Sequence, residues 1–212
     1  MNILEKVLHQ VQSYQGGRLF LVANFVVIIC VIVLFMAILL DFVEFHQRHN
    51  VKKRLRSWVE TGSMFAYFGG YYLLLKIRAG KVILLVGSIH EALIIIGMTL
   101  IALGCFVNVK GRLDLKHNWA NQVTIYDDHT LIIRGIYKIV RHPLYASIIW
   151  MLIGGCCIYN NFIALLSVVF IFIPMMYYRA KQEERMLSVE FPEYVDYTKR
   201  VGMFFPKLRI HG

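Results

Sequence analysis

Long apolar runs separated by short polar segments dominate the pattern of this sequence. The first run, residues 19–43, holds a single formal charge, Asp41, near its end. A helix needs about 20 apolar residues to cross the core of a bilayer. A signal peptide is the competing interpretation, but the run is too long, starts too late in the chain and lacks a small-residue cleavage site. The pattern therefore predicts a transmembrane helix, and with it an integral membrane protein.

Two further runs predict a second and a third helix. Residues 61–75 form a short run that is rich in glycine and aromatic residues. Residues 92–109 follow Ser88 and Glu91, whose spacing is that of a capping box at a helix start. The run 82–87 between them extends one of these helices or lies at the membrane interface, and the sequence leaves both open.

The last apolar stretch, residues 144–178, is too long for one crossing. It is interrupted by Tyr159, Asn160 and Asn161, and an asparagine pair favours a turn. We therefore predict a C-terminal helical hairpin whose first arm, about 143–158, is short. The fold class that follows is an all-α membrane protein with five transmembrane helices. The composition agrees, because 58% of the residues are hydrophobic, above the roughly 45–50% of soluble domains.

Basic residues predict the orientation of these helices. Segments 44–60, 110–144 and 179–212 would share one side of the membrane and carry 18 of the Lys and Arg residues. The opposite side would carry five. The positive-inside rule then places the N-terminus outside and the C-terminus in the cytoplasm. The net charge of +10 is explained by this asymmetry and by attraction to anionic lipid, without nucleic acid as a partner.

The four cysteines, Cys30, Cys105, Cys156 and Cys157, all lie within apolar runs. They lack the spacing of metal ligands and have no partners suited to a disulfide. We expect small buried side chains there, and no metal site.

The polar segments predict where chemistry takes place. Residues 1–109 would form three transmembrane helices with their loops, and residues 110–212 a catalytic core of loop, hairpin and tail within one integrated domain. The loop at 110–144 and the tail from 179 onward flank the hairpin. Both therefore return to the same membrane face, where a cytoplasmic site can be assembled from them.

The predicted hairpin is preceded directly by Arg141, His142 and Pro143. Proline is favoured in the first turn of a helix, so the helix should start near Pro143. A helix N-terminus attracts anions, and an arginine and an imidazole beside it would strengthen a carboxylate or phosphate site. The alternative is a snorkelling cation that serves only as a stop signal.

A second group of charges follows the hairpin. Arg179 and Glu183 are four residues apart and share a helix face, with Glu184 beside them. Arg179 directly follows an apolar run, and ionisable residues near lipid depth are suspected of function. Together with Arg141 and His142, these residues could hold a zwitterion.

These motifs resemble one known family. The segments "HTLIIRGIYKIVRHPLY" (129–145), "EERML" (183–187) and "EFPEYVDYTKRVGMFFP" (190–206), separated by a hydrophobic hairpin, are similar to the isoprenylcysteine carboxyl methyltransferases. That family also includes phospholipid methyltransferases. The resemblance covers roughly residues 108–206. It implies S-adenosylmethionine as cofactor, bound by the cytoplasmic half of the chain, and an acceptor that is lipophilic or prenylated.

The resemblance also implies site residues. Arg179 would position the methyl acceptor, Glu183 and Glu184 would lie beside cofactor and acceptor, and Arg141 matches the family's motif arginine. The implied cofactor contacts are Gln122, His129, Thr130, Leu131, Ile132, Tyr137, His142, Pro143, Leu144 and Tyr145. Gln122 matches by spacing alone. Lys116 replaces a glycine of the family pattern.

Several alternatives stay open from the sequence. A carboxylate acceptor needs only a cation to orient it, whereas an amine or thiol needs a base such as Glu183, Glu184 or His142. A sterol-reductase-like NADPH enzyme shares a similar hairpin motif, but Leu144 and the small number of helices disfavour it. A membrane scaffold or transporter component without catalysis is the third hypothesis. The oligomeric state is not predicted.

Overall fold

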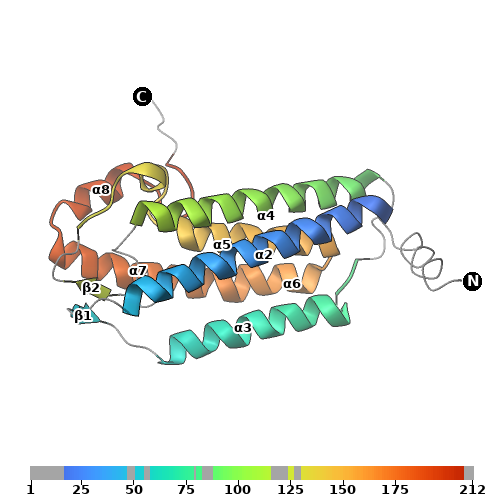
Figure 1. Cartoon of the computed structure of the whole chain (residues 1–212), viewed down its shortest axis with the longest axis horizontal. Coiled ribbons are helices and arrows are strands. Elements are labelled where there is room, and N and C mark those ends of the chain that lie inside the picture. The colour runs from blue at the N-terminus through green and yellow to red at the C-terminus, as the bar shows by residue number, and fades with distance from the viewer. Residues whose placement is uncertain are drawn as a thin grey trace, which may run out of the picture.

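Five rod-like helical segments lie side by side in the computed structural model (Figure 1). The structure describes residues 17–46, 51–54, 58–78, 80–82, 88–115, 124–126 and 130–207. The rods are α2 (Gly17–His46), α3 (Trp58–Ile77), α4 (Ser88–Leu115), α5 (Pro143–Tyr159) and the run α6 (Phe162–Ser167), η3 (Val168–Phe172) and α7 (Ile173–Glu190). Successive rods alternate in direction, so the chain passes back and forth along the bundle (Figure 1).

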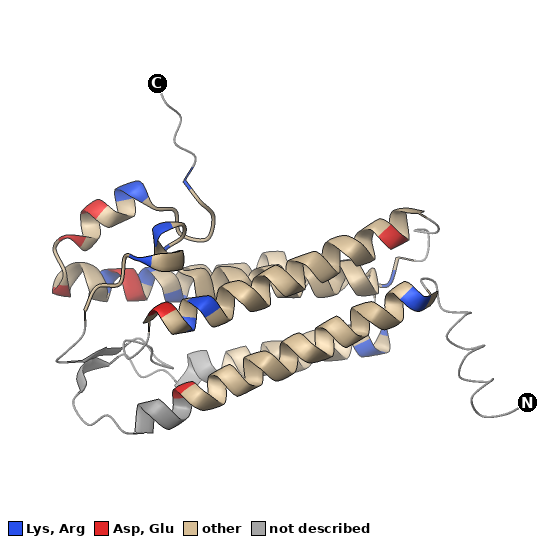
Figure 2. Cartoon of the chain, turned by 45° about the horizontal axis from the view of Figure 1, so that its top comes forward, with Lys and Arg blue, Asp and Glu red and all other residues tan. Residues whose placement is uncertain are grey.

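Length and composition identify the membrane-spanning part. Among the residues that the structure describes, three segments are long and apolar enough to cross a bilayer: Gly17–Asp41, Ser88–Leu115 and Phe162–Glu190. Pro143–Tyr159 is shorter, as predicted from the sequence. Lys, Arg, Asp and Glu gather at the two ends of the rods, and the middle is almost free of them (Figure 2). The protein is therefore an integral membrane protein, while the number of crossings stays a prediction.

A proline inside the last rod explains its irregular middle. Pro174 has no N–H to donate and clashes with a regular helix. A π-helical segment, Val168–Phe172, precedes this proline and accommodates it, so that the helix continues as α7. The predicted turn before this rod is confirmed: Asn160 takes the left-handed conformation (φ 49°, ψ 45°), and the side chain of Asn161 caps the next helix by accepting from the Ala164 N–H at 2.8 Å.

Glycines bring α4 and α5 into close contact. Gly97, Gly104 and Gly111 recur every seven residues on the face of α4 that meets α5. A Cβ on Gly97 would lie 2.5 Å from the Gly154 carbonyl oxygen, and one on Gly154 would lie 2.7 Å from that of Gly97. Small residues allow such backbone approach in membranes, where packing holds helices together. Both helices of this pair contribute residues to the wall of the cavity described below.

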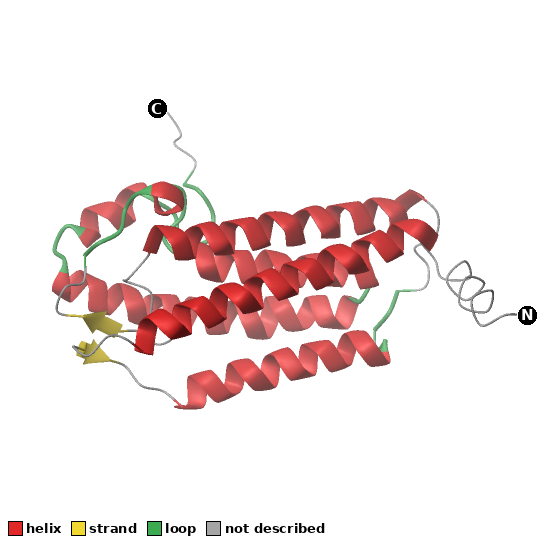
Figure 3. Cartoon of the chain, viewed as in Figure 1, coloured by secondary structure: helices red, strands yellow, loops and turns green. Residues whose placement is uncertain are grey.

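One part of the predicted fold class needs correction. Two short strands, β1 (Val51–Arg54) and β2 (Thr124–Tyr126), pair antiparallel at one end of the bundle, so the chain is not entirely α-helical (Figure 3). The strands come from the loops after α2 and α4, which the alternating rods bring to the same end. Four and three residues are too few to give a readable alternation in the sequence.

The C-terminal tail packs onto that same end. A short helix, α8 (Tyr194–Arg200), follows a break at Phe191 and Pro192. Tyr194, Tyr197 and Val201 form a buried cluster against Leu131, Leu187 and Phe191. Residues 200–204 then return to the start of α5, where Gly202 forms a parallel bridge with Val140.

Candidate functional site

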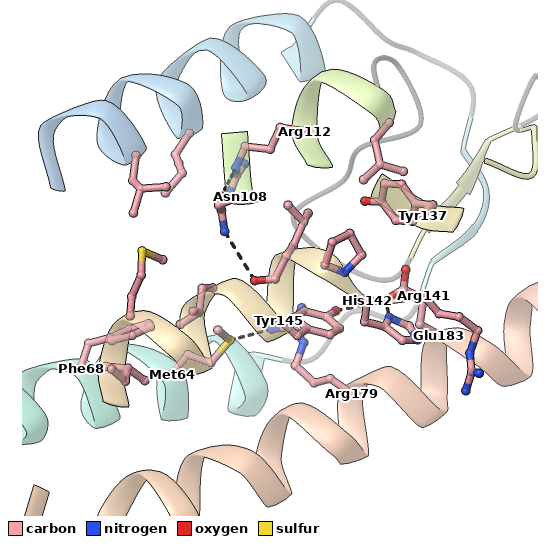
Figure 4. Close-up of a pocket in the computed structure, with 18 of the residues that line it drawn as sticks. Met64, Phe68, Asn108, Arg112, Tyr137, Arg141, His142, Tyr145, Arg179 and Glu183 are labelled. Carbon is pink, nitrogen blue, oxygen red and sulfur yellow. Dashed lines mark hydrogen bonds and ion pairs between the residues drawn. The ribbon is translucent and has the colours of Figure 1, made fainter. Parts of the chain in front are cut away.

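A cavity of about 740 Å³ connects the charged end of the bundle with its apolar interior. Its polar head is lined by residues of the 130–145 segment, α7 and α8, among them Thr130, Tyr137, His142, Arg179 and Glu183. Its apolar arm runs between α2, α3 and α5. The lining of that arm includes Val27, Val31, Leu34, Phe35, Met64, Phe65, Phe68, Ile148, Met151 and Leu152. Figure 4 labels Met64 and Phe68 of this arm beside Tyr145 and Arg179.

The predicted helix start at Pro143 organises the polar head. Pro143 occupies the first turn of α5, and His142 is the residue before it. The backbone N–H groups of Arg141 and His142 donate to the carbonyls of Gly202 (2.9 Å) and Met203 (3.1 Å). The returning tail therefore holds the residues ahead of α5 in place.

Arg141 is bound by protein groups in this arrangement. Its Nε and Nη2 lie 2.9 and 2.8 Å from Oε1 of Glu184, and Nη1 donates to the carbonyls of Thr198 (3.1 Å) and Val201. The side chains of Arg141 and Glu184 are each 9% exposed. We expected Arg141 to hold an anionic ligand directly. In the structure its guanidinium joins α7 to the tail, and Arg141 also lines the cavity, so that direct contact with an anionic ligand stays a prediction.

His142 lies between the two carboxylates of α7. Nδ1 is 3.5 Å from Oε2 of Glu183, and Nε2 is 3.3 Å from Oε1 of Glu184. Burial alone lowers the pKa of His142, but hydrogen bonds and charges from both glutamates outweigh it, so that the pKa is raised above its usual value. The imidazole thus favours its charged form and links the two carboxylates.

Tyr145, Arg179 and Glu183 form the wall where the head meets the apolar arm (Figure 4). The hydroxyl of Tyr145 donates to Glu183 at 3.2 Å, and its ring stacks on His142 with centroids 5.5 Å apart. The guanidinium of Arg179 lies 5.9 Å from the same ring and 2.8 Å from the sulfur of Met64 on α3. A cation, a carboxylate and an aromatic face therefore meet at one point.

Tyr137 enters the cavity from a short helical turn, η2 (Gly135–Lys138). Asp114, at the end of α4, accepts from the Ile136 N–H at 2.9 Å and from Lys110 at 2.6 Å. Gly135 has φ +59°, and a Cβ there would collide with the Asp114 carboxylate. Burial and nearby acidic groups raise the pKa of Tyr137 well above its usual value, so the phenol stays neutral.

Sequence reasoning missed a polar chain along the other wall of the cavity. Arg112 pairs with Asp41 of α2 and donates to Asn108 at 2.8 Å, and Asn108 donates to Ser147 of α5 at 2.8 Å. Asn108 and Arg112 both line the cavity. The signal was present, since two polar residues four apart at the end of an apolar helix share one face. The helix was predicted to end at 109, which placed Arg112 in a loop.

Most of the predicted site residues come together around the cavity. The lining includes Thr130, Leu131, Ile132, Tyr137, Arg141, His142, Pro143, Leu144, Tyr145, Arg179 and Glu183. Glu184 instead faces Arg141 and Lys181. Gln122 and His129 lie outside the described residues. Among the residues that the structure describes, no group of three His, Cys, Asp or Glu side chains could hold a metal ion.

This donor set fits S-adenosylmethionine. The molecule carries an amino group and a sulfonium, which suit the Glu183 carboxylate and aromatic faces such as that of Tyr145. It also carries a carboxylate, which suits a cation such as Arg179 or charged His142. The cavity contains each of these partners within its polar head.

Known proteins are similar in sequence to the part of the chain that forms this site. The pattern of the isoprenylcysteine carboxyl methyltransferase family matches residues 94–189, which confirms the resemblance seen in the sequence. The protein-S-isoprenylcysteine O-methyltransferase of Saccharomyces cerevisiae is 30% identical over 118 residues, 53% of this chain and 48% of the relative. The cobalt-zinc-cadmium resistance protein CzcN of Cupriavidus metallidurans is 30% identical over 116 residues, 54% of this chain and 51% of the relative.

A solved structure has the same fold. The eukaryotic intramembrane Ras methyltransferase ICMT superposes with a TM-score of 0.53 at 21% identity, covering 72% of this chain and 54% of that one. The chain thus spans about half the length of these relatives.

Proposed function

We propose, from the match of residues 94–189 to the pattern of the isoprenylcysteine carboxyl methyltransferase family, that the chain is an S-adenosylmethionine-dependent membrane methyltransferase with a lipophilic acceptor. The observation that carries the proposal is the shape of the 740 Å³ cavity, which joins a polar head to an apolar arm. An amphiphile could place its polar group in the head and its tail in the arm, because apolar surface favours an apolar lining.

In this proposal the polar head binds both the cofactor and the polar group of the acceptor. Bound S-adenosylmethionine supplies an electrophilic methyl group. Glu183 and Tyr145 would hold its charged end, with Tyr137, His142, Pro143 and the 130–132 segment around it. Gln122 and His129 remain cofactor contacts in the proposal by family resemblance alone.

Arg179 is the proposed positioning group for the acceptor. It stands between the Tyr145 ring and Met64, where the head opens into the arm. A cation orients a carboxylate without removing its nucleophilic electron pair, and methyl transfer depends mainly on such positioning and on exclusion of water. An isoprenylcysteine-type carboxylate is therefore the acceptor we favour. An amine acceptor, such as that of a phospholipid headgroup, or a thiol acceptor must lose a proton, and Glu183 would take up that proton.

Cofactor binding tests the proposal. We expect calorimetry on the purified chain in lipid nanodiscs to detect S-adenosylmethionine. Glu183→Gln should bind about 10- to 100-fold more weakly, because a charge-assisted hydrogen bond contributes roughly 1.5–3 kcal/mol. Lys199→Gln, a charge change at an exposed site on α8, serves as control and should bind normally. Absence of binding in both detergent and bilayer would exclude the proposed function.

The orientation is part of the proposal. With the basic segments inside, the charged end that holds α8 faces the cytoplasm. Lys207→Cys at that end and Ser88→Cys at the opposite end place thiols at exposed positions. A membrane-impermeant maleimide should label Ser88→Cys in intact cells, and Lys207→Cys only after permeabilisation. The reverse pattern would invert the topology.

A further inference from the structure

A second cavity, of about 340 Å³, lies at the end of the bundle opposite the polar head of the first cavity. Its walls come from the first turns of α2 and α4, the last turn of α3 and the end of α5, which meet at the end opposite α8 (Figure 1). Because these helix ends bound the apolar belt, we expect the cavity to lie near the depth of lipid headgroups. Leu75 and Tyr159 line this cavity and the larger one, so the two adjoin.

The charge of this second cavity is one-sided. Lys76, Arg78 and Lys81 line it, and no Asp or Glu is among the described residues of its lining. Basic residues are sparse on this side of the chain, with three of the five gathered here. They lie within six residues of one another, at the end of α3 and directly after it, and all three line the same cavity. Such a cluster of cations is suited to an anionic group.

Backbone hydrogen bonds fix the segment that carries these cations. The Phe162 N–H donates to Gly80 (3.0 Å), and the Val82 N–H donates to Asn160 (2.9 Å). Gly80 has φ +77°, and a Cβ there would collide with Ile163. Gly80 and Val82, on either side of Lys81, are therefore held against the α5–α6 turn, so that a ligand would meet Lys81 on an ordered backbone.

The remaining walls suit an amphiphilic ligand. The hydroxyl of Tyr159 donates to Oδ1 of Asn24 at 2.8 Å, and both residues line the cavity. His90, also in the lining, is buried, with its Nδ1 2.6 Å from Nδ2 of Asn160. Phe20, Leu21, Leu75 and Ile158 supply apolar surface. Leu21 is 40% exposed on the outer surface of α2, where the acyl chains of a lipid would continue.

We propose that this second cavity binds the headgroup of one anionic phospholipid, with its phosphate at Lys76, Arg78 and Lys81. The phosphate of such a lipid is a diester with a single negative charge, which nearby basic side chains attract. Free phosphate shares the charge but not the acyl chains, so the apolar walls favour the lipid. The proposal does not depend on methyl transfer.

Native mass spectrometry of the full chain, titrated with dioleoyl phosphatidylglycerol or dioleoyl phosphatidylcholine, tests this site. The wild-type chain should retain one phosphatidylglycerol in preference to phosphatidylcholine. Arg78→Gln/Lys81→Gln should bind it about 30-fold more weakly, because each basic residue near an anionic headgroup contributes on the order of 1 kcal/mol. The control Lys199→Gln/Lys207→Gln removes two exposed cations at the other end and should retain the lipid.

Three results would overturn the lipid site. The wild-type chain could retain both lipids equally, which does not depend on any variant folding. The control could lose phosphatidylglycerol as strongly as the cavity variant, which would show a general charge effect. Inorganic phosphate at millimolar concentration could displace the lipid and raise the melting temperature equally, which would identify free phosphate as the ligand.

Discussion

Arg141 and Glu184 form a buried ion pair, with Nη2 2.8 Å from Oε1, that ties the start of α5 to α7. Through the carbonyls of Thr198 and Val201, the same guanidinium also holds the C-terminal tail. Three segments that surround the cavity therefore meet at one arginine. The ion pair joins two motifs that lie 43 residues apart in the sequence.

Glu184→Gln should destabilise the protein strongly. It leaves the buried Arg141 guanidinium without a full counter-charge, and breaking a buried pair typically removes about 3 kcal/mol or more. We expect a melting temperature roughly 5–10 °C lower in detergent. Lys181→Gln removes the more exposed partner of the same carboxylate, 3.2 Å away, and should have little effect. Equal effects of both variants would contradict the central role of the Arg141 pair.

Stability should fall as the pH rises above neutrality. The pKa of His142 is raised in the folded protein by Glu183 and Glu184, despite its burial. The charged imidazole therefore contributes stability that is complete below its unfolded pKa of about 6.5 and is lost as the pH passes its folded pKa. Melting temperatures measured from pH 6 to 9 should decline in the wild-type chain and decline less in His142→Gln. An identical slope in both would exclude this residue as the source.

Gly135→Ala should disturb the Tyr137 wall of the cavity. A left-handed conformation costs an alanine about 1–2 kcal/mol, and the new Cβ would collide with Asp114. We expect a loss of about 2 kcal/mol or more in unfolding free energy and weaker cofactor binding by calorimetry. Gly70→Ala is the matched control, since a Cβ there meets nothing within 4 Å. A stable Gly135→Ala chain with normal binding would show that this turn tolerates a side chain.

Val31→Phe should select against long acceptor tails. Val31 lines the apolar arm from α2, whereas its neighbour Ile32 does not, although both are similarly exposed at 59% and 56%. Filling the arm should lower turnover of prenylcysteine analogues with long chains roughly tenfold, while short analogues are unaffected. Ile32→Phe should leave both unchanged. A uniform loss for all chain lengths would argue that the tail binds elsewhere.

The sequence predicted the framework well because each part of it has a local signal. Apolar runs marked the rods, the Asn160-Asn161 pair marked the hairpin turn, and Pro143 marked the start of α5. Arg179 and Glu183 were placed together by helix periodicity and by family resemblance, and both line the cavity.

What the sequence could not provide depends on long-range contacts. The bonds from Arg141 to the carbonyls of Thr198 and Val201 were not predicted, because these residues lie 57 and 60 residues away and no local pattern reports such contacts. The β1–β2 pair likewise joins loops more than 60 residues apart. The role of Asn108 and Arg112 depended on α4 continuing to Leu115, a boundary that polar residues in its last turns had obscured.

Methyl transfer itself tests the central claim most directly. The purified chain in nanodiscs would be incubated with methyl-labelled S-adenosylmethionine, extracted membrane lipids and prenylcysteine analogues, and the products would be separated by extraction. We predict label in a lipophilic product, base-labile if the acceptor is a carboxylate, with Arg179→Lys raising KM for the acceptor while cofactor binding is retained. No label in any lipophilic product, by a chain that binds the cofactor, would contradict the account.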